Sequence, residues 1–118
     1  MALGDPVALV IAALTAAGVP ASGRPLDPRP DSFATVRRIG GLAMNQALEY
    51  ARLAVEVWAP TAPACVALAN TARATLAALP ETSTAVNACR EALVFETPDP
   101  ETGLPRTRVD VDVWLAIN

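Results

Sequence analysis

The spacing of apolar side chains near the start of the chain predicts an α-helix over 6–17. One apolar stripe recurs at helical intervals and consists of Val7, Val10, Ile11 and Leu14. Asp5 can cap the first free N–H groups, and Pro6 suits the first turn because no N–H is needed there. We expect Gly18 and Pro20 to end the helix.

The same kind of pattern predicts a second, longer helix between Thr61 and Pro80. Its stripe of apolar and small side chains consists of Cys65, Leu68, Ala69, Ala72, Leu76 and Leu79. Thr61 can cap this helix, Pro63 is tolerated in its first turn, and Pro80 is expected to close it. The small side chains allow the helix to lie close against a sheet.

Alternating apolar and polar positions predict a first pair of β-strands, over 33–39 and 52–58. Paired glycines usually supply backbone conformations that other residues avoid, so we expect Gly40 and Gly41 to end the first strand. Residues 42–50 have weak helical propensity and no clear cap, so we expect a loop, or a loop that contains one turn of helix. The two strands then pair as a long-looped hairpin.

A second hairpin is predicted in the last third of the chain. Within 86–97 the second half alternates like a strand, and 98–103 has the composition of a turn. Residues 107–117 then alternate six times in succession, which is the strongest strand pattern in the chain. Valines and other apolar residues take one face, and the opposite face carries Arg108, Asp110, Asp112, Trp114 and Ala116.

The segment 20–31, the proline arm, contains four prolines in twelve residues. Proline fixes its own backbone and restricts the residue before it, so we expect a stiff, extended surface arm. It would lie over its own domain or over a neighbouring subunit. The element order is then αββαββ within one domain over 1–118. This order predicts an α+β fold, a mainly antiparallel four-stranded sheet with helices on one face.

Composition excludes several classes of function. The chain contains no histidine, so a catalytic relay or metal site built on imidazole is impossible. Cys65 and Cys89 are too few for a disulfide scaffold or a zinc ribbon, and we expect buried thiols in a reducing compartment. The net charge of −3 argues against wrapping nucleic acid. The most apolar stretch, 7–17, is about half a membrane span, so we expect no membrane partner.

Charged residues on the last strand are the main candidates for chemistry. Asp110 and Asp112 share a face, where two carboxylates could hold a metal or act as acid and base. Arg106 and Arg108 share the same face, and alternating charge of this kind is typical of a solvated or subunit-facing surface. No nucleotide-binding motif or nucleophile elbow occurs in the sequence. We therefore expect no cofactor and a structural or interaction role rather than catalysis.

Several moderate motifs follow one another along almost the whole chain, roughly 5–117. They are Pro25-x-x-Pro28-Arg-Pro30-x-x-Phe33-x-x-Val36-Arg-Arg38-x-Gly40-Gly41, then Leu53-x-Val55-x-Val57-Trp58-Ala59, an alanine-rich helix with Ala69 and Ala72-Arg73, and Pro98-Asp-Pro100-x-x-Gly103-x-Pro105-Arg106 before the final valine strand. In order and spacing the chain resembles the tail-terminator proteins of long, flexible-tailed bacteriophages, especially those of GC-rich actinobacterial hosts.

This resemblance implies a structural virion protein of tail-terminator-like fold that is assembled in the host cytoplasm. Such proteins form a hexameric ring on the head-proximal end of the tail tube. The ring stops addition of the major tail tube protein and offers a docking surface to the head-completion or neck protein. DNA passes through the lumen without specific binding, which an acidic protein favours because it does not attract phosphates.

Under this hypothesis, subunit contacts come from the proline arm and the charged strand face, and the loops 40–50 and 98–105 protrude toward tube or neck. The residues expected at subunit or partner interfaces are Arg29, Arg37, Gly40, Gly41, Arg106, Arg108, Asp110 and Asp112. The alternatives are a head-completion or neck connector of the same virion, a small non-viral binding domain or enzyme accessory subunit, and a catalytic role for carboxylates and arginines.

Overall fold

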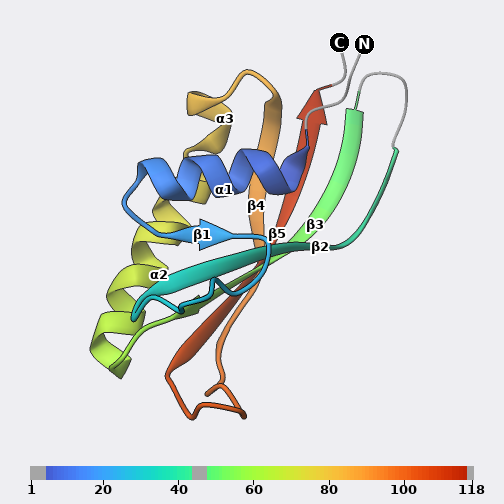
Figure 1. Ribbon diagram of the computed structural model, residues 1–118. Helices are drawn as coiled ribbons and strands as arrows, with labels where there is room; N and C mark the ends of the chain where they lie inside the picture. The colour runs from blue at the N-terminus through green and yellow to red at the C-terminus, as the bar shows by residue number, and fades with distance from the viewer. Residues whose placement is uncertain (1–4, 44–47, 117–118) are drawn as a thin grey trace.

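A computed structural model describes residues 5–43 and 48–116. This part of the chain forms an α+β fold with three helices and a five-stranded mixed sheet (Figure 1). The elements are α1 (Pro6–Ala16), β1 (Ala21–Ser22), β2 (Phe33–Ala43), β3 (Leu48–Trp58), α2 (Ala62–Ala77), α3 (Leu79–Thr82), β4 (Val86–Glu96) and β5 (Arg106–Ala116). The strand order is β1-β2-β3-β5-β4, and β1–β2 is the parallel pair.

The prediction of four antiparallel strands is wrong because the proline arm contributes a fifth. β1 pairs in parallel with Ala34 and Thr35 of β2, and the Ala34 N–H donates to the Pro20 carbonyl at 2.7 Å. A two-residue strand is too short to leave a period in the sequence. The rest of the arm, 23–31, is mostly exposed and has no helix or strand, as predicted.

The loop predicted over 40–50 is strand wherever the structure describes it. β2 continues through Gly40 and Gly41 to Ala43, and β3 begins at Leu48. The pairing shifts between Arg38 and Gly40, which makes a β-bulge. Gly41 has a φ of 133°, and a Cβ there would lie 2.3 Å from the Tyr50 carbonyl oxygen. The glycine thus allows two backbones to approach closely instead of ending the strand. The rest of the predicted loop, 44–47, lies outside the described residues.

β4 is a strand over its whole length, although only its second half was predicted. Its pairing with β5 shifts twice, between Val86 and Ala88 and again between Glu91 and Leu93. Each shift inserts one extra residue and moves the following side chains to the opposite phase. The alternation of apolar and polar positions is therefore broken in the sequence although the strand is continuous.

Both predicted N-caps are confirmed. Asp5 Oδ1 accepts from the Val7 N–H at 3.0 Å, and Thr61 Oγ1 accepts from the Ala64 N–H at 3.2 Å. The predicted end of the second helix is wrong, since α2 ends at Ala77 and Pro80 lies in the first turn of α3. Proline is tolerated in a first turn, where its missing N–H costs no hydrogen bond.

The core lies between the sheet and the helices, with α1 and α2 on the same side (Figure 1). This confirms the expectation of helices on one face. Large, fully buried members of the core are Val10, Leu14, Val19, Val36, Leu53, Val55, Val57, Leu76, Leu79, Val109 and Leu115. Among the described residues, no helix is long and apolar enough to cross a membrane.

Replacement of a core side chain should destabilise the fold strongly. Leu53 is fully buried on β3, so Leu53→Ala should lower the free energy of unfolding by roughly 2–5 kcal/mol through lost burial and a residual cavity. Val66 on α2 is 41% exposed, and Val66→Ala should change it by less than about 0.5 kcal/mol. Urea denaturation measures both, and equal effects would contradict this description of the core.

Candidate functional site

The sheet face opposite the helices, here called the open face, carries most of the charged residues expected to act. Cross-strand pairing aligns Trp58 with Arg106, Glu56 with Arg108, Ala54 with Asp110, Arg52 with Asp112 and Tyr50 with Trp114. Hydrogen bonds and ion pairs join the polar members in three groups, which together are called the open-face network: Arg37, Glu56 and Arg106; Tyr50, Arg52 and Asp112; and Arg108 with Asp110.

Asp112 is the best-bonded carboxylate of this network. It accepts from Arg52 Nε at 2.7 Å and Nη2 at 2.9 Å, and from the Tyr50 hydroxyl at 2.6 Å. The hydrogen bonds from Arg52 are the main reason that the pKa of Asp112 lies below its usual value. The same carboxylate raises the pKa of Tyr50. Asp112 is therefore held as an anion and is a fixed acceptor rather than a proton donor.

Glu56 occupies the middle of the network, with an arginine on each side. Its carboxylate lies 3.5 Å from Arg37 Nε and 3.3 Å from Arg106 Nη1. Nearby, Arg108 donates to Asp110 on the same strand at 2.8 Å. Asp110 is only 7% exposed. Each carboxylate of the network is thus matched by a guanidinium, so the network has fixed ion pairs without an uncompensated buried charge.

One end of the open face is closed by an aromatic cluster that holds the proline arm. The Phe33 and Trp58 rings stack with centroids 4.7 Å apart, and the guanidinium of Arg29 lies 5.3 Å from the Phe33 centroid. The Trp58 indole N–H donates to Asp99 Oδ2 at 2.9 Å. Arg29 is also 3.8 Å from that carboxylate. The arm and the β4–β5 turn are therefore fixed to the same tryptophan.

The predicted site residues fall into three places. Arg37, Arg106, Arg108, Asp110 and Asp112 meet on the open face, Arg29 joins the aromatic cluster, and Gly40 and Gly41 lie in the distal part of β2. Arg37 faces the open side whereas Arg38 is opposite the core residue Leu53, so the prediction that these arginines do not form one basic patch is confirmed. The role of all these residues as subunit contacts stays a prediction.

The alternative in which Asp110 and Asp112 hold a metal or act as acid and base has little support in the geometry. Their carboxylates bond to different arginines, Arg108 and Arg52. Residues 5–43 and 48–116 bring no group of three or more cysteine, aspartate and glutamate side chains together as metal ligands.

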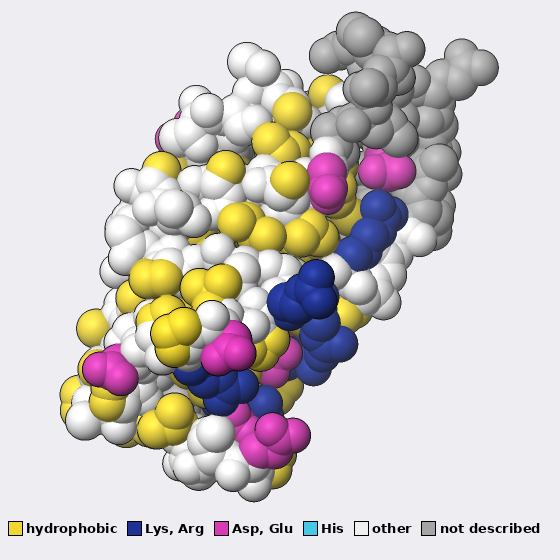
Figure 2. Space-filling view, viewed as in Figure 1, with side chains coloured by type: hydrophobic (Ala, Val, Ile, Leu, Met, Phe, Trp, Pro, Cys, Tyr) yellow, Lys and Arg dark blue, Asp and Glu magenta, His cyan; other side chains and the backbone are white. Residues whose placement is uncertain are grey.

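Basic side chains form a band along the side of the molecule that carries β2, with acidic side chains among them (Figure 2).

Sequence reasoning missed Tyr50, Arg52 and Asp99. The first two lie in or next to the segment predicted as a loop, and their bonds to Asp112 span about half of the chain. The signal for Arg52 is present once β3 and β5 are paired, because a register that aligns Val55 with Val109 brings Arg52 opposite Asp112. Nothing in the local sequence indicates that Asp99 accepts from Trp58.

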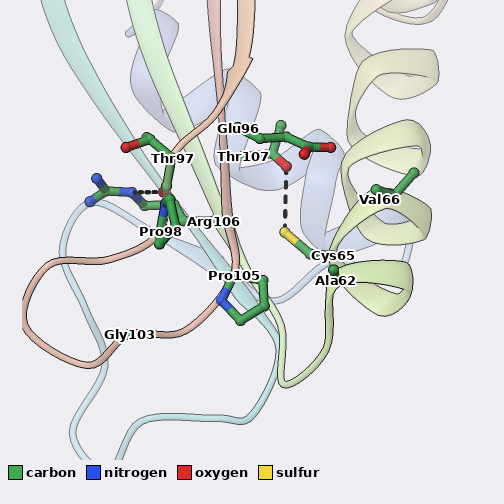
Figure 3. Close-up of a pocket in the computed structure, with 10 residues that line it drawn as sticks. All are labelled: Ala62, Cys65, Val66, Glu96, Thr97, Pro98, Gly103, Pro105, Arg106 and Thr107. Atoms are coloured by element: carbon green, nitrogen blue, oxygen red, sulfur yellow. Dashed lines mark hydrogen bonds between the residues drawn. The ribbon is translucent and has the colours of Figure 1, made fainter.

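A hollow of about 320 Å³ lies between the start of α2 and the β4–β5 hairpin (Figure 3). Val66, Pro98 and Pro105 line it together with Cys65, whose sulfur lies 3.5 Å from Thr107 Oγ1. The lining is mostly apolar, and its charged members are Glu96 and Arg106. Such a hollow suits a small apolar group more than a charged ligand.

Both cysteines are free thiols. Cys65 is buried, as expected, whereas Cys89 is only partly buried. Burial is the main reason that the pKa of Cys89 rises to about 11. At neutral pH this thiol stays protonated, so it is a poor nucleophile.

Comparison of the sequence with models of protein families and with curated proteins gives no match.

The carboxyl group of Asp112 should titrate below the usual aspartate pKa of about 3.9. Arg52→Gln should raise this pKa because it removes the principal hydrogen bonds, and Tyr50→Phe should raise it less. Since folding lowers the pKa, this contribution to stability is present above about pH 3.9 and is lost as the pH falls through the folded value. Carbon-13 NMR titration of the carboxyl group measures each pKa. An unchanged value in Arg52→Gln would contradict the assignment.

Proposed function

We propose that the chain is a structural, non-enzymatic virion protein of the tail-terminator type. Copies of it form a ring, expected to be a hexamer, on the head-proximal end of a phage tail tube. The ring stops polymerisation of the tube protein and provides the docking surface for the head-completion or neck protein. Growth ends because one axial face of the ring matches the last tube ring while the other lacks the polymerising surface.

The observation that carries the proposal is the presence of different projections at opposite ends of an elongated molecule. The molecule measures 44 × 24 × 24 Å. The β2–β3 hairpin extends beyond the helices at one end of the sheet, and the β4–β5 turn lies at the other (Figure 1). A subunit that must contact a tube on one side and a neck on the other needs two such unlike ends.

The β4–β5 turn, which includes the predicted projection 98–105, has a fixed shape. Asp99 accepts from the Gly103 N–H at 2.7 Å through its carbonyl and from the Glu101 N–H at 2.9 Å through its side chain. Trp58 anchors the same carboxylate. A preorganised turn loses little conformational entropy when it docks, which favours a contact surface over a flexible linker.

The open face supports a geometric role at a repeated interface. Its network contains four arginines and three carboxylates, so it is close to neutral. Partly exposed ion pairs of this kind contribute little stability, but they restrict the orientation of a partner.

The experiment that tests the proposal is electron microscopy of lysates from a phage that encodes this chain, with the gene deleted. We expect tails of uncontrolled, excessive length that carry no heads, beside DNA-filled heads, because nothing stops tube growth. Complementation with the intact gene on a plasmid is the control and should restore normal tails joined to heads.

Two other outcomes would contradict the terminator role. Tails of normal length that fail to join heads would assign the chain to the neck. Intact infectious particles would exclude both virion roles and favour a small binding domain, for which the hollow beside Cys65 is the candidate ligand site. Stabilisation of the purified protein by a small apolar compound in a thermal-shift assay would then support that class.

A further inference from the structure

Both edges of the sheet present unpaired backbone. β4 is the last strand on one side, and on the other side β1 covers only Ala34 and Thr35 of β2. Within the described residues, the Val86 N–H at the start of β4 donates to the Ser83 carbonyl, and no further backbone group bonds to the outer edge of β2 beyond Thr35 or of β4 over 87–96. Such edges are templates for pairing with another chain.

The edge at β4 is also apolar. Leu93 is 52% exposed, and Val94 and Phe95 are each 37% exposed. Leu93 and Phe95 lie opposite Asp110 and Arg108 and therefore share the open face, whereas Val94 lies on the helix face. On the opposite edge, Ile39 at the β2 bulge is 37% exposed.

Strand polarity allows the two edges to join head to tail. β2, β3, β5 and β4 alternate in direction because each neighbouring pair is antiparallel. β2 and β4 therefore run in opposite directions. A second copy related by rotation about an axis near the strand direction places its β2 antiparallel to β4 of the first copy. The alternation then continues across the boundary, and every copy uses both edges.

Charge selects the register of this contact. The exposed part of β4 lies opposite 107–112 of β5, and the open part of β2 aligns with 109–115. If the second copy is displaced along the strands by two residues, roughly 7 Å, its open part of β2 lies beside the exposed part of β4. An even shift also keeps the helix-side residues of both strands on the same side of the joined sheet. Arg38 of the second copy then lies opposite Val94, diagonally between Glu91 and Glu96, within reach of both.

Within its own chain Arg38 lies 3.7 Å from Glu49 and donates to the carbonyls of Gly40 and Tyr50. The acidic edge of β4 offers it a further carboxylate. Glu91 is bonded to Arg73, but Glu96 makes no ion pair within the part of the chain that the structure describes. On the open side, the same register places Arg37 of the second copy opposite Phe95, where a guanidinium can lie over the ring. Apolar, cationic and anionic positions therefore match along one strand pair.

We propose that a second copy of this chain binds at the β4 edge through its β2 edge, with Arg38 meeting Glu96, so that the sheet continues from subunit to subunit. This inference deepens the proposed ring and rests on it for its closure. It identifies the lateral subunit contact as edge pairing.

Sedimentation analysis of the purified chain over a range of concentrations tests this contact. The wild-type protein should assemble into more than two copies of the 12.2 kDa chain. Association should weaken roughly tenfold or more in each of three variants, Leu93→Lys, Glu96→Arg and Arg38→Glu. Leu93→Lys buries a charge in the contact, and each of the other two places like charges opposite each other. The double variant Glu96→Arg/Arg38→Glu should recover association, and the matched reversal Glu81→Arg on α3 should leave it unchanged. Circular dichroism confirms that each variant is folded.

Hydrogen–deuterium exchange gives a second readout that does not depend on substitutions. Amides of β2 beyond Thr35 and of β4 should both gain protection in the assembled protein relative to dilute protein. A monomer at every concentration, a dimer protected at β4 alone, or failure of the double variant to recover would overturn the edge contact. An assembly that persists in Leu93→Lys and Glu96→Arg would overturn it too, and the ring proposal would then stand with a different interface.

Discussion

The alternation of side chains along β5 is the constraint on which the rest of the structure depends. β5 is paired with β3 on one side and β4 on the other, and its valines are buried in the core. A slip of one residue would bury Asp112 against the helices and expose Val111 and Val113. The register of the neighbouring strands is therefore fixed, and with it the side chains that meet on the open face.

This constraint also explains which elements the sequence predicts well. Leu53, Val55 and Val57 alternate because one face of β3 packs against the core beneath the helices. The caps of α1 and α2 use Asp5 and Thr61 as expected. Prediction fails where bulges change the phase, beyond Arg38 in β2 and in the first half of β4. It also fails for β1, whose two residues pair through backbone groups alone.

The open face could be predicted only in part for the same reason. Spacing along one strand places Arg108, Asp110 and Asp112 on one side, because that is a local property. Their partners depend on strand pairing: Asp112 is bound by Arg52, sixty residues away in the chain. Local spacing therefore gives the composition of the face, whereas the ion pairs that fix its charges follow only from the sheet register.

The irregularities of β4 decide how its exposed edge behaves. A flat apolar edge with Leu93 and Phe95 uncovered would pair with any extended chain and cause aggregation. The bulges in β4 bend and twist this strand, and Glu91 and Glu96 add charge beside the apolar residues. A partner strand must then match both the bend and the charges. The β2 edge meets these conditions, since it has a bulge of its own at Ile39 and an arginine at 38. Features that blunt the edge against indiscriminate pairing thus also give it a preferred partner.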